Sequence, residues 1–121
     1  MSSCLYVAVG GAVGSVLRYL VGLIKVSEAT AFPVKTLMIN IAGSFLIGLI
    51  AALAGNRPET DPNTVLLLKV GVCGGFTTFS TFALETADLL HNGKSVIAVL
   101  YVILSVLLSL TAVFAAQHLV K

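Results

Sequence analysis

Long apolar runs separated by short polar connections extend from one end of the chain to the other. A membrane-spanning helix needs roughly 20 mostly apolar residues to cross a hydrocarbon core about 30 Å thick. The pattern predicts four such spans, at Cys4 to Ile24, Thr36 to Ala54, Val65 to Leu90 and Ser95 to Gln117. They use up nearly all of the sequence. We therefore expect an all-α integral membrane protein with one four-helix transmembrane domain, residues 1–121.

Composition agrees with this pattern and narrows the possible functions. The chain is 58% hydrophobic and 10% charged, with a mean hydropathy of +1.07, so a soluble domain is excluded. The first apolar segment lacks a basic leader and runs past signal-peptide length, so we expect it to be retained. Cys4 and Cys73 are two isolated cysteines within predicted spans, where small apolar filling is expected. The net charge of +2 comes without a basic run, so we expect no nucleic-acid partner.

The third span contains the most informative segment, GVCGGFTTFSTF, from Gly71 to Phe82. Glycine permits the dihedral angles of a helix break, so we expect the break around Gly71, Gly74 and Gly75. In hydrocarbon, irregular backbone is tolerated only where it is buried in protein or lines a water-filled path. Carbonyls freed at such a break can hold a desolvated cation such as sodium. The segment therefore favours a conductor or transporter of something small.

The first span carries a stripe of small residues with one charge. Gly10, Gly14, Arg18 and Gly22 recur every four residues, a spacing that lets helices pack closely in lipid. An arginine inside a span carries an insertion penalty of roughly 3 kcal/mol and needs a partner, a cavity or the interface. Two interpretations of Arg18 stay open, which are snorkelling toward the headgroups and attraction of anions.

The second and fourth spans each place polar groups on one helical face. Asn40 shares a face with Ser44 and Gly48, and its amide either bonds a neighbouring helix or donates to an anion that is losing water. In the fourth span the polar residues Tyr101, Ser105 and Ser109 repeat every four positions. Such hydroxyls either bond back to their own helix or replace water around an ion.

Aromatic and acidic residues follow the expected break. Phe79 and Phe82 are three residues apart, as two core aromatics often are. Aromatic rings also have electropositive edges, and edges beside a polar path can stabilise a small anion without trapping it. Glu85 and Asp88 come later, where we expect the helix to leave the bilayer.

Basic residues are balanced between the two sides of the predicted bundle. Orientation in the membrane is biased by Lys and Arg in short flanking segments. Arg57, Lys69 and Lys121 fall on the side of the N-terminus, and a second set of three falls on the opposite side: Lys25, Lys35 and Lys94. This balance either permits insertion in both orientations or is tipped by Arg18 or the free N-terminus. Four short helices can hardly enclose a polar path, so we expect an oligomer.

Taken together, three features resemble the Fluc family of small bacterial fluoride ion channels, also called CrcB. They are the string GGFTTFSTF from Gly74 to Phe82, the glycine stripe around Arg18, and Asn40 with Gly43. The resemblance covers the whole chain. It implies a fluoride-selective passive channel that exports fluoride across the bacterial plasma membrane and protects against fluoride toxicity. It also implies an antiparallel, dual-topology homodimer with two pores, in membrane lipid, and a structural sodium ion at the dimer interface.

The resemblance further assigns residues by their position in the family's pattern. Backbone carbonyls of Gly74 and Thr77 would hold the sodium ion. Arg18 matches the first-helix arginine, whose role is harder to assign. The implied fluoride pore consists of Asn40, Phe79, Phe82, Tyr101, Ser105, Ser109 and Glu85.

Two other classes of membrane protein compete with the channel. A small multidrug-type proton-coupled antiporter of organic cations also has four spans, but it needs a membrane-embedded acidic residue. The first two spans contain none, and Glu85 comes late in the third. A non-conducting subunit of a larger complex would explain the glycine stripe and leave the break unexplained. An enzyme is not expected, because no nucleophile, base or metal cluster converges.

Overall fold

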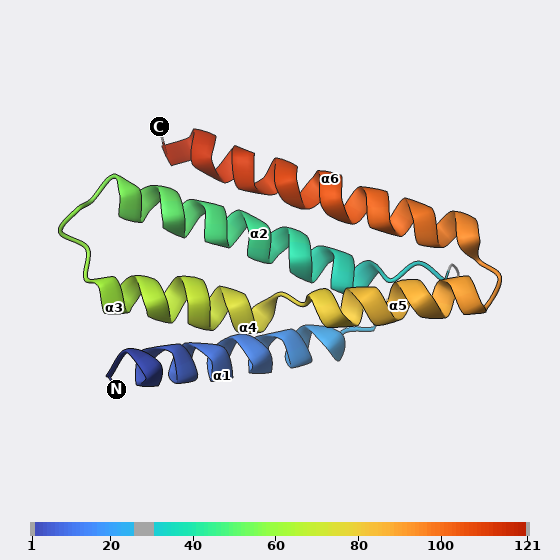
Figure 1. The fold of residues 1–121 in the computed structure, drawn as a ribbon, viewed down its shortest axis with the longest axis horizontal. Helices are drawn as coiled ribbons and strands as arrows, with labels where there is room; N and C mark the ends of the chain where they lie inside the picture. Colours follow the sequence, from blue (N-terminus) through green and yellow to red (C-terminus); the bar gives the residue numbers. More distant parts are fainter. Residues whose placement is uncertain (1, 26–30, 121) are drawn as a thin grey trace.

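The computed structural model describes residues 2–25 and 31–120, and these residues fold as four long helices joined by short connections (Figure 1). The first two are α1 (Ser2–Gly22) and α2 (Val34–Gly55), and the last is α6 (Ser95–Val120). The third is built from four pieces, α3 (Pro62–Val65), η1 (Leu66–Cys73), α4 (Gly74–Phe76) and α5 (Phe79–His91). All four are long and apolar enough to cross a membrane, which confirms the predicted fold class.

The helices alternate in direction, so that both chain ends lie at the same end of the bundle (Figure 1). α2 runs through the middle, with α6 along one side and the third span along the other. α1 packs against η1 and α4, which form the first half of the third span. α5, the second half of the third span, packs against α6 instead. The third span therefore changes neighbours at its break.

Most large apolar side chains of the four spans are exposed, including Leu5, Leu20, Val96 and Leu107. A soluble protein rarely leaves so much apolar surface uncovered. In a bilayer the same surface faces lipid and carries no penalty. The buried core is correspondingly small and centres on Leu37, Leu89, Ala98 and Tyr101.

Gly10 and Gly14 of the α1 stripe pack against the third span, as the spacing predicts, whereas a Cβ on Gly22 would meet nothing within 4 Å. Gly10 lies against Gly71 so closely that a Cβ on Gly71 would come within 2.7 Å of the Gly10 Cα. A Cβ on Gly14 would overlap the carbonyl oxygen of Val72. A Cβ on Gly75 would lie 2.6 Å from the carbonyl oxygen of Gly11. These glycines are needed because the two backbones touch.

We expect Gly14→Ala to destabilise the protein, because its methyl group must push the backbone of Val72 away. Overpacking of this kind costs about 1–3 kcal/mol. Gly11→Ala is the matched control, since a Cβ at Gly11 meets nothing within 4 Å. Thermal unfolding in detergent should show a lower midpoint for Gly14→Ala alone. Equal midpoints for the two variants would contradict the close packing.

The third helix breaks as predicted, but the predicted position of the break is wrong. Gly71 lies in η1, and Gly74 and Gly75 lie in α4, so all three glycines are helical. The two residues outside the helix are Thr77 and Thr78, with ψ angles of 158° and 118°. Gly71 and Gly75 contact the backbone of α1, while polar side chains hold the extended threonines. η1 is also a π-helix, which the apolar pattern does not distinguish from an α-helix.

Basic residues gather at both ends of the bundle in the described part of the chain. Arg57 follows α2, and Lys69 lies near the start of the third span. The opposite end carries Lys25, Lys35 and Lys94. Lys121, the remaining residue of the predicted balance, lies outside the described residues. The inference that the chain inserts in both orientations stays a prediction.

Candidate functional site at the helix break

Asn40 of α2 holds the break of the third span through two hydrogen bonds to one residue. Its Nδ2 donates to the Thr78 carbonyl oxygen at 3.1 Å, and its Oδ1 accepts from the Thr78 N–H at 2.9 Å. The side-chain amide thus pairs with both backbone groups of Thr78, as a neighbouring strand would. One N–H of the Asn40 amide remains for another acceptor. Both interpretations of Asn40 therefore stay available.

Thr78 also starts the helix that follows the break. Its Oγ1 accepts from the Thr81 N–H at 3.1 Å, which makes Thr78 the N-cap of α5. A capping threonine satisfies one of the N–H groups that lack a partner in the first turn. The preceding residue, Thr77, instead donates its hydroxyl back to the Cys73 carbonyl at 2.9 Å. Thr77 therefore belongs to the end of one helix, and Thr78 to the start of the next.

The break removes the helical donors of four carbonyl groups, those of residues 74–77. In a continuous helix the Gly74 carbonyl would accept from the Thr78 N–H, and the Thr77 carbonyl from the Thr81 N–H. Asn40 and the Thr78 hydroxyl take those two donors. Carbonyl oxygens freed in this way are ligands suited to a hard cation.

Another of these carbonyls, that of Gly75, accepts from Arg18. The Arg18 Nε lies 3.2 Å from this oxygen, and the arginine is half-buried. The intramembrane arginine therefore has a partner within the protein at the end of α4. A cation beside the C-terminal end of a helix segment also stabilises its partial negative charge.

A cavity of about 500 Å³ lies beside the break, between α2, the third span and α6. Its described lining contains hydroxyls, an amide, a thiol and apolar groups, but no charged side chain. Several predicted pore residues meet there: Asn40, Phe79, Phe82, Ser105 and Ser109 line it together with Thr77. A cavity with polar donors and no fixed charge can hold an ion without binding it irreversibly.

Among the residues of this cavity, Ser105 gives the strongest indication of a ligand. Its side chain is 7% exposed, and its Oγ has no hydrogen-bond partner among the described residues. Buried hydroxyls normally have a partner, and leaving one without a partner costs about 1–3 kcal/mol. Ser109, one turn further along α6, is half-buried in the same lining. The hydroxyl of Ser105 is therefore available to something that enters the cavity.

Three aromatic rings form a row from the cavity toward Glu85. The centroids of Phe79 and Phe82 lie 5.6 Å apart, and those of Phe82 and Tyr101 lie 5.0 Å apart. Both pairs are tilted rather than stacked, at 52° and 55°. Phe79 is 79% exposed in the single chain, whereas Tyr101 is fully buried. The row thus begins on an open face of the bundle and ends in its core.

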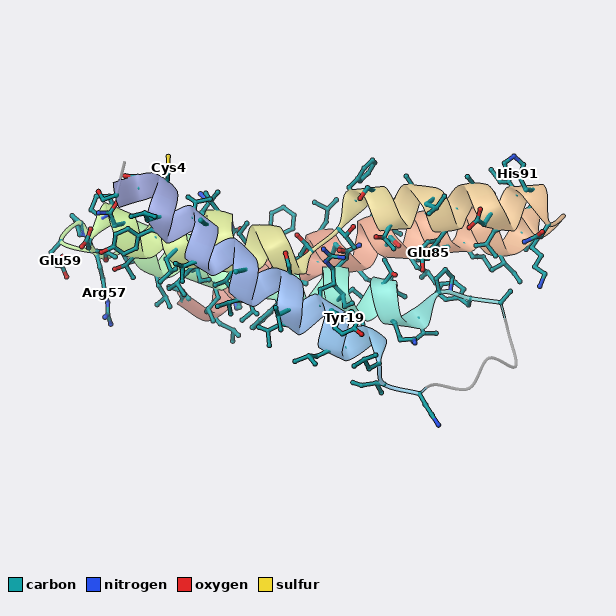
Figure 2. The ribbon with its side chains drawn as sticks, turned by 90° about the horizontal axis from the view of Figure 1, so that it is seen from below. Cys4, Tyr19, Arg57, Glu59, Glu85 and His91 are labelled. Atoms are coloured by element: carbon teal, nitrogen blue, oxygen red, sulfur yellow. The ribbon has the colours of Figure 1, made fainter. Side chains whose placement is uncertain are left out.

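Glu85 is held inside the bundle by two hydroxyl groups, instead of lying free where α5 ends. Tyr101 of α6 donates to Oε1 at 2.8 Å, and Thr36 of α2 donates to Oε2 at 3.1 Å. Figure 2 shows Glu85 partway along α5, well before His91 at the helix end. The two hydroxyl donors therefore hold the Glu85 carboxylate between α2 and α6, and the expectation that Glu85 lies where the helix leaves the bilayer stays a prediction.

The predicted site residues fall into three groups. The first group lines the cavity. Glu85 and Tyr101 form the second group and do not line it, but the ring of Phe82 belongs to the lining and also packs against Tyr101. Arg18 lies on the side of α4 that faces α1, away from both. Two important residues were missed. Thr36 continues the Asn40 face by one turn, and Thr78 is a residue type favoured at the N-cap of a helix.

This architecture defines a multi-pass α-helical membrane protein with a polar site at a broken helix. The chain belongs to the family described as "CrcB-like protein, Camphor Resistance (CrcB)", whose model matches residues 5–117. It is 45% identical to a protein of Rhizobium meliloti (strain 1021), over all of this chain and 98% of that protein. It is 46% identical to a protein of Shewanella amazonensis, over 99% of this chain and 97% of that one. Both relatives are named "Fluoride-specific ion channel FluC". The four spans and the family place the protein in the bacterial cell membrane.

Proposed function

We propose that this protein is a fluoride-selective passive channel that lets fluoride leave the cytoplasm. The observation that carries the proposal is the hydroxyl of Ser105, which has no partner among residues 2–25 and 31–120 and lines an uncharged cavity beside the break. Full-length relatives named as fluoride channels support it. On this proposal the protein is a channel and not an enzyme.

Fluoride is small and strongly hydrated, so its path must offer donors that replace water. Ser105, Ser109 and the remaining N–H of Asn40 supply such donors in the lining of the cavity. The edges of Phe79 and Phe82, which belong to the same lining, would add weak positive potential. No lysine or arginine lines the cavity within the described part of the chain, so nothing there would hold the anion too tightly.

The Glu85 cluster orients Tyr101 at one end of this path. Both carboxylate oxygens accept from hydroxyls, so the negative charge of Glu85 is partly neutralised where the row of rings ends. A charge-assisted hydrogen bond fixes the Tyr101 hydroxyl more firmly than water would. We assign Glu85 and Tyr101 to the pore end rather than to the ion-binding cavity.

Two copies of the chain would complete the pores as an antiparallel, dual-topology homodimer. Phe79 and Gly74 lie on an exposed face beside the break, where a second copy can cover them. The backbone carbonyls of Gly74 and Thr77 from both copies would hold a sodium ion there. This fits the donor set, because both carbonyls have lost their helical donors while no acidic or cysteine cluster suited to a metal occurs in residues 2–25 and 31–120. The ion would supply a fixed positive charge between the two broken helices.

Halide efflux from liposomes containing the purified protein tests the proposal. A potassium ionophore relieves charge build-up, and selective electrodes follow fluoride and chloride. We expect rapid loss of fluoride with retention of chloride. If correctly assembled protein releases no fluoride, the channel is excluded and proton-coupled efflux of organic cations becomes the next assay. The names of the relatives do not support that antiporter alternative.

We expect Ser105→Ala to slow fluoride efflux by roughly tenfold or more, because a hydrogen bond to an ion contributes about 1.5–3 kcal/mol. Ser105→Thr, which keeps the hydroxyl, should retain more flux than Ser105→Ala. Thr111→Ala is the control on the same helix, since the Thr111 hydroxyl already donates to the Leu107 carbonyl and is exposed. Equal efflux rates in Ser105→Ala and Thr111→Ala would remove Ser105 from the path.

A further inference from the structure

Cys73 is a free thiol in the wall of the cavity, and the proposed conduction path does not use it. It is the last residue of η1, and its side chain is 2% exposed. It lines the same cavity as Ser105 and Ser109. The other cysteine, Cys4, is exposed near the start of α1, and in Figure 2 its sulfur points away from the bundle.

A second observation indicates that small molecules reach this part of the cavity. The Ser105 hydroxyl is more than nine-tenths buried, lacks a partner among the described residues, and lines the same space. A buried polar group in this condition indicates a ligand that the chain itself does not supply. Whatever reaches Ser105 enters the space that Cys73 also borders.

We propose that Cys73 is a modification site for small neutral thiol-reactive molecules, and that a group attached there obstructs the cavity. The obstruction of fluoride flux rests on the proposed channel function, whereas the modification itself does not. The lining is largely apolar and contains no carboxylate to pair with a permanent cation, whereas a neutral molecule needs no such partner. The small exposed fraction of Cys73 further limits the reagent to a compact one.

Methyl methanethiosulfonate is a suitable probe of this site. The Cys73 thiolate attacks the S-methyl sulfur of the reagent and forms a mixed disulfide. The sulfur–sulfur bond of the reagent breaks, methanesulfinate leaves with the electron pair, and the thiol proton passes to the buffer. The cysteine sulfur is oxidised as the sulfonyl sulfur is reduced, so no further oxidant is needed. Dithiothreitol reverses the reaction by thiol–disulfide exchange.

The experiment uses full-length protein in liposomes, treated with this neutral reagent or with its trimethylammonium-ethyl analogue, which is larger and cationic. Cys4→Ser leaves Cys73 as the one thiol, and Cys73→Ser leaves Cys4. Intact mass reports the adduct, and fluoride efflux is compared with the same variant untreated. We expect the neutral reagent to label Cys4→Ser and to remove most of the fluoride flux of this variant. Dithiothreitol should then remove the label and restore the flux. The cationic analogue should leave Cys4→Ser unlabelled and unblocked.

In Cys73→Ser, both reagents should label Cys4 without changing the flux of that variant. If Cys4→Ser is labelled by the neutral reagent only after denaturation, Cys73 is not a modification site. If it is labelled while its flux stays unchanged, the inferred obstruction is wrong. A loss of flux in treated Cys73→Ser would also overturn the assignment. Should untreated protein carry no fluoride at all, the proposed function fails, while the mass measurement still decides whether Cys73 is modified.

Discussion

Asn40→Asp should abolish fluoride efflux. The substitution replaces the Nδ2 donor by an oxygen that faces the Thr78 carbonyl, so two acceptors meet where a hydrogen bond of 3.1 Å stood. Losing one partner of a buried hydrogen bond costs about 1–3 kcal/mol. The new carboxylate also places a negative charge in the lining of a cavity proposed to carry an anion. Both effects act against conduction, and liposome efflux measures their sum.

Asn40→Ala separates the two effects, because it adds no charge. If Asn40 only keeps the path electrically favourable, the alanine variant retains much of its flux. The structure favours a loss in this variant too, since the Thr78 N–H loses its acceptor and the Thr78 carbonyl loses the donor that reaches it from α2. Asn56→Asp is the matched control, as Asn56 is exposed at the end of α2 and bonds the Val120 carbonyl. Undiminished flux in Asn40→Asp would remove Asn40 from the site.

The sequence alone predicts the four helices because the bilayer imposes their length and apolar character. Composition and span length together leave few other folds for this chain. The close contact of the first helix can also be predicted from local sequence, since four-residue spacing puts Gly10 and Gly14 on one face. These features depend on residues near one another in the chain, and the structure confirms them.

The position of the break was mispredicted because it depends on a distant residue. Glycine propensity indicates Gly71, Gly74 and Gly75, yet all three are helical, and Gly71 and Gly75 instead contact the backbone of α1. The break itself needs an amide from α2, 38 residues away in sequence, to satisfy Thr78. The hydrogen bonds of Glu85 could not be predicted for the same reason, as its two donors come from α2 and α6. Hydrogen bonds between helices determine both features, and the periodicity within one helix gives no information about such bonds.

Phe79→Ile and Phe82→Ile should each impair fluoride flux while the protein remains assembled. Isoleucine keeps an apolar side chain at each position but removes the electropositive ring edge proposed to face the anion. Phe82→Ile also removes the ring that joins the cavity to Tyr101, whose centroid lies 5.0 Å away. Liposome efflux reports flux, and size-exclusion chromatography in detergent reports assembly.

Phe114→Ile is the control that separates a ring in the path from a ring on the surface. Phe79 and Phe114 are 79% and 66% exposed in the single chain, but only Phe79 lines the cavity. If exposed rings serve membrane contact alone, the two variants behave alike. If the edges act on the ion, Phe79→Ile loses flux and Phe114→Ile does not. Flux of the unmodified protein in both Phe79→Ile and Phe82→Ile would show that these rings only pack, which would leave the hydroxyls of α6 and the amide of Asn40 to carry selectivity.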